Sequence, residues 1–435
     1  MSLFGAMNTA ISGLTSQSAA FSNISDNVAN SQTVGFKRVD TAFIDYLTTS
    51  NATTNLSGAA VARPEYMNNI QGTVAQTDNP LGLAIAGQGF FPVSHPAGSV
   101  SGQTSFSPTP YFTRTGDFQL NKSGYVVNSA GEYLNGWSVN STTGMVNRNV
   151  VAPIQVNQTV FNPVATSKVT LSANLPATPA TGSVVSSQVN VYDGLGTAHT
   201  VTLNWKQNAT NDWTVAVAVP DDITAAARGT ADVQFGNTSG NAVSDGTVGN
   251  LSAATGSMTT TAYTANASAD LSFTANFGQG SQTIVLNLGN FGQSVGLTQY
   301  AGTSYSLRGL SQDGVPPGSF ASITTSTSGD LSVNYDNGQS RVIARVPVVT
   351  FASPNALQRQ DGQSFTASIE SGNPLTQDAG TNGAGNLVTG SIEQSNVDIA
   401  QEFSKLIVAQ RAYSANTKLV TTADQLLQET IDMKR

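Results

Sequence analysis

The chain has 435 residues, a formal net charge of −8 at pH 7, and no cysteine. Only 10% of its residues are charged, against about 25% in average domains. Such a surface is rich in hydroxyl and amide groups, as in secreted or assembled β proteins. Binding to nucleic acid requires clustered Lys and Arg, which this acidic composition excludes. The absence of cysteine excludes disulfides, thiolate metal sites and cysteine nucleophiles.

Membrane and export signals are also missing from the sequence. No run of about 18 apolar residues is present, so we expect no membrane-spanning helix. The first basic residue is Lys37, whereas a cleaved signal peptide begins with a positively charged segment. If the protein is exported, we therefore expect export without a cleaved signal peptide.

Residues 1 to about 30 are predicted to form a helix with an apolar stripe. The stripe repeats at steps of 3 and 4, the spacing of helices that wind around a partner helix. Asp26 is the only charged residue before Lys37, so we expect burial on all sides, by a C-terminal helix and by neighbouring subunits. An ordinary buried helix of a monomer gives the same pattern. The stripe consists of Phe4, Met7, Ile11, Leu14, Ser18, Phe21, Ser25 and Val28.

The segment Gly390–Arg435 is predicted to contain one long helix, because no Pro or Gly follows Gly390. Ser395 and Asp398 have the spacing of a capping box, in which each side chain binds a backbone N–H of the first turn. Asn416 is the polar member of a heptad seam, and one buried Asn fixes the register of paired helices. Such a helix can also simply cover the core of its own domain. The seam consists of Leu406, Ala409, Tyr413, Asn416, Val420, Ala423 and Leu427.

Between the helices the pattern predicts nested β domains. Short strands separated by Gly- and Asn-rich turns indicate mainly antiparallel sheets of sandwich or barrel type. The predicted fold class is therefore mixed: terminal helices that form a coiled coil, and an outer β domain inserted into an inner one. The predicted boundaries are 1–40 and 391–435 for the helical domain, 41–76 and 356–390 for linkers, 77–160 and 297–355 for the inner domain, and 161–296 for the outer domain.

No arrangement of residues predicts catalysis, a metal site or a cofactor site. The two histidines, His95 and His199, are far apart in the sequence and in turn-like contexts. Asp221 and Asp222 are a conceivable carboxylate pair for glycoside cleavage, but acids in turns are ordinarily turn formers. We therefore expect a protein that is not an enzyme and that binds no cofactor.

The junction after the first helix carries the most specific motif. Residues 23–37 read Asn-Ile-Ser-Asp-Asn-Val-Ala-Asn-Ser-Gln-Thr-Val-Gly-Phe-Lys. In this motif Asn30 can end the helix, Gly35 can turn the chain and Phe36 can anchor the exit. The segment resembles the N-terminal signature of the bacterial flagellar rod and hook proteins, and residues 395–416 resemble the matching C-terminal signature.

The resemblance implies a structural subunit of a flexible helical tube that transmits motor torque from the rod to the filament. It also implies that the residues named above in both helices, with Asn30, Gly35 and Phe36, are assembly contacts. The implied partners are further copies of the chain, the distal rod, the hook cap protein, the hook–filament junction protein and the flagellar export apparatus. The implied location is extracellular, in the hook and basal body of the flagellum.

Two alternatives to a hook subunit remain at this point. One is a distal-rod subunit of the same family, although the large insertion at 161–297 favours the hook. The other is a secreted β-rich adhesin whose helices form an oligomerisation stalk. An adhesin needs aromatic side chains that face a ligand, whereas Trp205 and Trp213 have the strand spacing of core residues.

Overall fold

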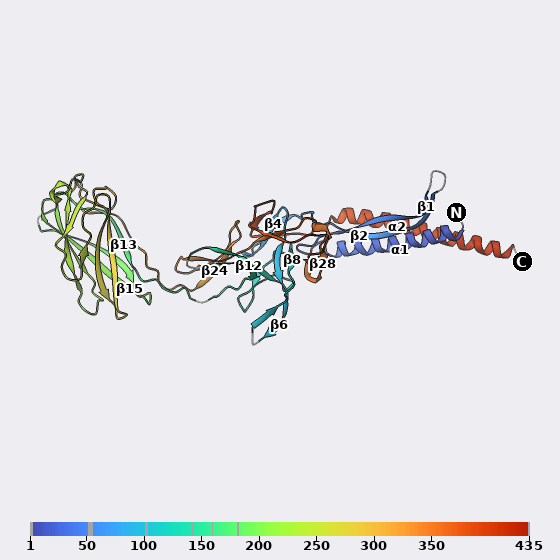
Figure 1. Ribbon diagram of the computed structural model, residues 1–435, viewed down its shortest axis with the longest axis horizontal. Coiled ribbons are helices and arrows are strands. Elements are labelled where there is room, and N and C mark those ends of the chain that lie inside the picture. The colour runs from blue at the N-terminus through green and yellow to red at the C-terminus, as the bar shows by residue number, and fades with distance from the viewer. Residues whose placement is uncertain are drawn as a thin grey trace. The chain divides into compact units, whose positions relative to one another are not determined.

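The computed structural model describes residues 3–50, 55–100, 103–140, 143–158, 160–180 and 182–433. This part of the chain is mostly β, with one α-helix near each end, α1 (Leu3–Ala29) and α2 (Ile399–Asp432). The two helices lie side by side (Figure 1). The prediction of a β-rich chain with paired terminal helices is thus confirmed. Neither of these helices is long and apolar enough to cross a membrane in the part that the structure describes.

The chain divides into two compact units. Unit 1 contains Met1–Gln158, Ala321–Asn334 and Ser340–Arg435, and unit 2 contains Thr159–Phe320 and Tyr335–Gln339. Both termini therefore belong to the same unit, and the residues of unit 2 come between its first and later segments in the sequence.

Helix α2 runs without a break, as the sequence predicts. Its N-cap is Asp398, whose carboxylate accepts hydrogen bonds from the N–H groups of Ala400 and Gln401. The predicted capping box was wrong, because Ser395 lies outside the helix and Asp398 itself occupies the N-cap position. An aspartate there satisfies the free N–H groups and also suits the positive end of the helix dipole.

Residues 39–66, expected to lie mostly in a linker, form a long antiparallel hairpin instead. Its strands are β1 (Val39–Ser50) and β2 (Asn55–Tyr66), and they lie along α1 (Figure 1). Ser16 of α1 donates a hydrogen bond to the carbonyl of Ala60 at 2.7 Å, and the Ser12 hydroxyl accepts one from the N–H of Ala60 at 3.1 Å. Because polar side chains of a helix support β2, the hairpin does not need the alternation by which strands are recognised.

The central sheet of unit 1 joins segments from distant parts of the sequence. The second expected linker, 356–390, was likewise wrong as a description of structure, since it contributes strands β28, β29, β30 and β31 to unit 1. The Asn337-Gly338 hairpin that joins β25 to β26 is confirmed. In spatial order the sheet contains β24 (Phe320–Thr325), β25 (Asp330–Tyr335), β26 (Ser340–Arg345), β11 (Tyr133–Val139), β5 (Phe91–Ser94), β8 (Tyr111–Thr113), β29 (Ser364–Thr366) and β28 (Gln358–Arg359), with β10 (Val126–Val127) and β12 (Val146–Pro153) beside β11 and β9 (Gln119–Leu120) beside β10.

Short strand pairs complete unit 1 around this sheet. They pair β3 (Val74–Gln76) with β32 (Ser391–Glu393), β4 (Leu83–Ala86) with β31 (Asn386–Thr389), β6 (Pro96–Val100) with β7 (Gln103–Phe106), and β27 (Val348–Thr350) with β30 (Leu375–Gln377). The β3–β32 pair holds the chain just before α2 against the segment that follows the β1–β2 hairpin. Short 3-10 turns are η1 (Gly236–Ser239) in unit 2, and η2 (Pro354–Ala356) and η3 (Asp361–Gln363) in unit 1.

Unit 2 consists of two sheets over a shared apolar core. Trp205 and Trp213 are fully buried in that core, as predicted. Residues 297–312 were expected in the inner domain, and this expectation was wrong, because β22 and β23 pair with β13 in unit 2. Pairing between strands so far apart in the sequence leaves no local sequence pattern from which it could be predicted. One sheet contains β14 (Val184–Tyr192), β15 (Ala198–Ala209), β16 (Asp212–Ala218), β17 (Ala227–Phe235) and β18 (Val248–Ser252), and the other contains β13 (Lys168–Asn174), β19 (Thr259–Thr260), β20 (Ser268–Asn276), β21 (Ser281–Asn290), β22 (Leu297–Thr298) and β23 (Ser306–Gln312).

Candidate functional site

The two terminal helices pack against each other in opposite directions. A Cβ atom added to Gly13 of α1 would lie 2.8 Å from Nδ2 of Asn416 on α2. Further along α1, the rings of Phe21 and Tyr413 meet edge to face with centroids 6.3 Å apart. From the first contact to the second the residue number rises on α1 and falls on α2, so the two helices are antiparallel. Because Gly13 has no side chain, the amide of Asn416 fits directly against α1 at this point.

The seam predicted for α2 coincides with the least exposed face of that helix. Ala409 and Ala423 are buried, and Tyr413 is 42% exposed although its ring packs on Phe21. The remaining seam residues are half-buried: Leu406, Asn416, Val420 and Leu427. The structure therefore brings the seam residues to the side of α2 that faces α1.

The stripe predicted for α1 is less buried than a different set of residues. Ile11 is 45% exposed, and Ser18 and Ser25 are exposed as well, while Met7, Leu14, Phe21 and Val28 are half-buried. The side chain of Phe4 lies outside the described residues. The most buried residues of α1 are Ala10, Ser16, Ala20, Ile24 and Asn27. The unforeseen hairpin explains this shift, because α1 has to bury one face against α2 and another against β1 and β2.

Asn27 ties α1 to both of its neighbours. Its side-chain amide exchanges two hydrogen bonds with the backbone of Val39 at the start of β1, each 2.9 Å long. The same Nδ2 donates to Oε2 of Glu402 on α2 at 3.1 Å. Asn27 and Glu402 are both fully buried. Sequence reasoning missed both residues, because nothing local marks two polar side chains 375 residues apart as partners.

The junction after α1 has the roles that its motif suggests. Asn30 donates its backbone N–H and its side-chain amide to the carbonyl of Asp26, which ends the helix. Gly35 has a φ of +70°, and a Cβ there would lie 2.6 Å from the backbone N of Thr115, so only glycine fits. Phe36 is buried beneath the guanidinium of Arg359, whose Cζ lies 4.8 Å from the ring centroid.

A buried cluster of charges inside unit 1 joins the segment after α1, the segment before α2 and the loop that follows β8. Glu393, just before α2, accepts from Lys37 Nζ at 2.5 Å and from Arg114 at 2.8 Å, and all three side chains are almost fully buried. Its carboxylate also accepts from the N–H of Gly72 at 2.8 Å. Burial lowers the pKa of Lys37 to about 8, although the charge of Glu393 opposes this shift. Sequence reasoning did not predict a buried charge cluster and gave none of these three residues a role in one.

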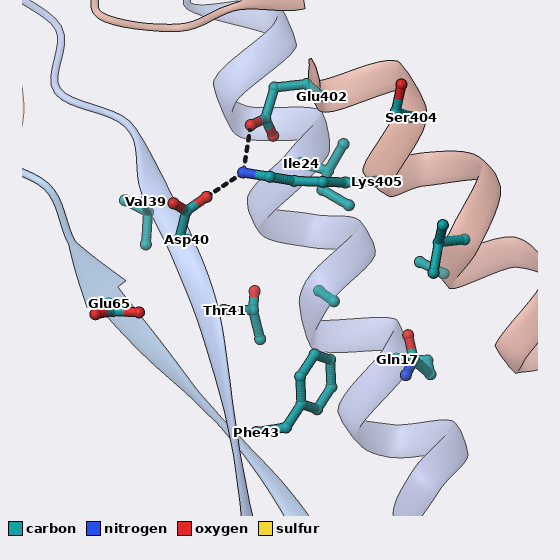
Figure 2. Close-up of a pocket in the computed structure, with 13 residues that line it drawn as sticks. Gln17, Ile24, Val39, Asp40, Thr41, Phe43, Glu65, Glu402, Ser404 and Lys405 are labelled. Atoms are coloured by element: carbon teal, nitrogen blue, oxygen red, sulfur yellow. Dashed lines mark hydrogen bonds and ion pairs between the residues drawn. The ribbon is translucent and has the colours of Figure 1, made fainter. Parts of the chain in front are cut away.

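A groove lies beside this helical pair, between α1, the hairpin and the first turns of α2 (Figure 2). Its volume is about 580 Å³. Lys405 of α2 reaches across to Asp40 of β1 and also pairs with Glu402 at 2.8 Å. Partial burial lowers the pKa of Lys405, but these hydrogen bonds outweigh it and the pKa is raised. The other lining residues are Gln17, Ala20, Ile24, Val39, Thr41, Phe43, Glu65, Ser404, Val408 and Ala409.

Comparison with known proteins identifies the family. The chain is 32% identical over 440 residues to the flagellar hook protein FlgE of Brucella suis, and the alignment covers 100% of both chains. The chain belongs to the flagellar hook protein family. Hook proteins of Rhizobium meliloti (28% over 445 residues, 100% of both chains) and Salmonella typhimurium (27% over 439 residues, 98% of this chain and 99% of that one) also match.

Four family models match successive parts of this hook-family chain. They are "Flagella basal body rod protein" over 7–37, "Flagellar hook protein FlgE/F/G D1 domain" over 84–174, "Flagellar basal body protein FlaE D2 domain" over 155–315 and "Flagellar basal body rod FlgEFG protein C-terminal" over 388–433. The crystal structure of Helicobacter pylori flagellar hook protein FlgE2 aligns with 13% identity and a TM-score of 0.48, over 72% of this chain and 98% of that chain. That structural likeness is too weak to support further argument.

The resemblance stated from the two terminal signatures is thus confirmed, and the chain is a structural subunit of the flagellar hook. Its relatives are structural hook proteins rather than enzymes. The adhesin alternative loses its support, because the hook relatives match the whole chain and both tryptophans of unit 2 are fully buried.

Glu393→Gln is expected to destabilise unit 1 by about 3–5 kcal/mol, because Lys37 and Arg114 would then be buried without a counter-charge. The free energy of unfolding from urea titrations measures this. Arg148→Gln is the matched control: its ion pair with Asp378 is at the surface, with 53% of the Arg148 side chain exposed, so a loss below about 1 kcal/mol is expected. Equal effects of the two variants would contradict the assigned role of Glu393.

The stability contribution of Lys37 is expected to depend on pH. Its pKa is 10.5 in the unfolded chain and about 8 in the folded one. Between these values the unfolded chain holds a proton that the folded chain lacks, so the free energy of unfolding rises with pH across this window. Below pH 8 the side chain is charged in both the folded and the unfolded state, so it adds no pH dependence to the free energy of unfolding. Lys37→Met removes the titrating group, so the free energy of unfolding of the variant, measured in urea, should not rise with pH across this window. Parallel pH profiles for the parent and the variant would refute the assignment of this pH dependence to Lys37.

Proposed function

We propose that the chain polymerises through its terminal helices into the flexible tube of the hook, which transmits motor torque from the rod to the filament. The observation that carries this proposal is the α1–α2 pair with one side uncovered. α1 carries Asp26 as its only charge, and its stripe is only half-buried within one copy. A helix with a single charge and a remaining apolar stripe is suited to burial against further helices.

The low surface charge supports the flexible character of the tube. Bending requires neighbouring subunits to shift against one another while remaining attached. Hydroxyl and amide contacts can be exchanged at little cost, whereas oriented ion pairs fix one register. With 10% charged residues, this chain offers mostly exchangeable contacts. We propose that its β domains are nested, the outer one inserted into the inner one, and that they form the outer layers that slide.

The α1–α2 pair is proposed to act as a coiled coil that lines the central channel of the tube. Support comes from the 3 and 4 spacing of the α2 seam and from the small residues, Ala409 and Ala423, that are buried there. The proposed partners beyond further copies are the distal rod, the hook cap protein, the hook–filament junction protein and the export apparatus. The proposed location is extracellular, in the hook of the flagellum.

Leu406→Glu is expected to abolish polymerisation and leave both β units folded. Glutamate is a good helix former, so α2 should persist while a charge replaces an apolar side chain of the seam. Electron microscopy measures tube formation, and circular dichroism measures folding. Gln410→Glu is the matched control, because Gln410 is exposed on α2, and it should form tubes as the parent does. Normal tubes from Leu406→Glu would rule out the seam as an assembly contact.

Asn416→Leu tests whether this residue fixes the register of the helices. The side-chain amide of Asn416 lies against Gly13 of α1. A leucine there removes the polar group that penalises alternative registers, so we expect tubes with altered or mixed helical parameters. Cryo-electron microscopy of the tubes gives the measurement. Unchanged helical parameters would show that Asn416 does not set the register.

A further inference from the structure

Three Asn-Gly pairs occur in the sequence, and the structure gives each of them different surroundings. An asparagine before a glycine can lose its side-chain amide without an enzyme, because glycine has no Cβ to keep its backbone nitrogen away from the asparagine Cγ. Ring closure needs that nitrogen free of a hydrogen bond and the asparagine side chain free to turn, so the folded chain can protect one pair and expose another. The pairs are Asn135-Gly136 in β11, Asn337-Gly338 between β25 and β26, and Asn382-Gly383 between β30 and β31.

The pair in β11 is enclosed in the central sheet of unit 1. Asn135 is 8% exposed, and its amide group exchanges hydrogen bonds of 2.9 and 3.1 Å with the hydroxyl of Ser94. Gly136 pairs with Ala152 of β12, and a Cβ atom added to it would lie 2.7 Å from the side chain of Ile154. The surroundings therefore hold both the side chain and the backbone of this pair in place.

The pair between β25 and β26 is less buried, but hydrogen bonds restrain it. Gly338 donates its backbone N–H to the carbonyl of Tyr335 at 3.1 Å, so the nitrogen that would attack is already bonded. The side-chain amide of Asn337 donates to the carbonyl of Pro316 at 2.9 Å, and its oxygen accepts from the N–H of Gln339 at 3.0 Å. These hydrogen bonds have to break before the ring can close.

The pair between β30 and β31 is exposed and has no such restraint. Asn382 has a φ of +47° and Gly383 a φ of +86°, the left-handed values that a type I′ turn requires at its two central positions. The N–H of Ala384 closes the turn on the carbonyl of Thr381 at 2.8 Å. Neither the N–H of Gly383 nor the amide of Asn382 has a hydrogen-bond partner among the described residues. A Cβ atom added to Gly383 would meet nothing within 4 Å, so the tip of the turn has room to move.

We propose that Asn382 is a site of spontaneous deamidation, at which the chain acquires aspartate and isoaspartate. The backbone nitrogen of Gly383 loses its proton and attacks Cγ of Asn382, the side-chain nitrogen leaves as ammonia, and a succinimide ring forms. Water then opens the ring at one of its two carbonyls, which gives aspartate or isoaspartate. The net reaction consumes one water and releases one ammonia, and it needs no other reactant.

The modification changes the charge of a surface that otherwise has none. Asn382 and Gly383 line a groove of about 420 Å³ in unit 1, and the described residues that line it include no charged side chain. Deamidation places one carboxylate there and makes the formal net charge of −8 more negative by one unit. The inference does not depend on the proposed polymerisation, because the reaction needs only the folded chain and water.

Peptide mapping of the full-length chain tests the proposal. The folded protein is incubated in mildly alkaline buffer, which favours loss of the N–H proton, and conversion at each of the three pairs is followed by mass spectrometry. Conversion at Asn382 is expected to be at least about tenfold faster than at Asn135 or Asn337, because these two sites must first break hydrogen bonds. Equal conversion at either of these sites, or no conversion at Asn382, would overturn the proposal.

The same incubation in guanidinium chloride separates the effect of the structure from that of the sequence. Unfolding removes the hydrogen bonds that protect Asn135 and Asn337, so the rates at the three pairs should become similar. If the difference between the rates in the folded chain persists in the unfolded one, the local sequence controls the reaction and the structural argument is wrong.

Asn382→Gln is the matched variant. Glutamine carries the same amide on a longer side chain, which closes the corresponding ring far more slowly. Isoelectric focusing of the incubated parent should show an acidic species that accumulates with time and that the variant forms much more slowly. Circular dichroism before incubation checks that the variant is folded. The same acidic species at the same rate in the variant would assign the modification to another residue and refute the proposal.

Discussion

The structure depends on one buried carboxylate. Glu393 lies immediately before the segment that leads into α2, and it binds Lys37 from the segment after α1 and Arg114 from the central part of unit 1. Two cations and one anion without solvent are costly to bury, and the geometry compensates with backbone partners for each of them. Because the chain just after α1 and the chain just before α2 are both anchored at this point, the two helices extend from it side by side and antiparallel.

The periodicity of α2 was predictable, because burial on a helix against one partner follows its heptad spacing. The most buried residues of α1 were not predictable, because α1 packs against two partners and the sequence did not predict one of them, the β1–β2 hairpin. The hairpin of residues 39–66 is rich in Thr, Ala, Asn and Ser, and serine hydroxyls of α1 form hydrogen bonds to its backbone. A pattern search that relies on apolar alternation assigns such residues to a linker.

The remaining errors share a different cause. Strands β22 and β23 pair with β13, more than a hundred residues earlier, and β31 pairs with β4 across 300 residues. Neither of the two paired segments contains a local sequence pattern that identifies its distant partner. Glu393 belongs to the same class, since its sequence context shows neither its burial nor its partners. What was predictable about the site lay in local motifs: a chain turn at Gly35, Phe36 as an anchor after α1, and the alanines of the α2 seam.

The buried carboxylate also orders the events of folding. Lys37 is among the first residues to be synthesised, but its counter-charge is 356 residues away. Until residue 393 is available, Lys37 and Arg114 have no anion at this position, and burying them is unfavourable. Strands β29, β31 and β32 also come late in the chain. Unit 1 is therefore completed last, by closure of a very long loop, which is the slowest kind of contact to form. A chain that ends before residue 393 therefore cannot complete the charge cluster of unit 1.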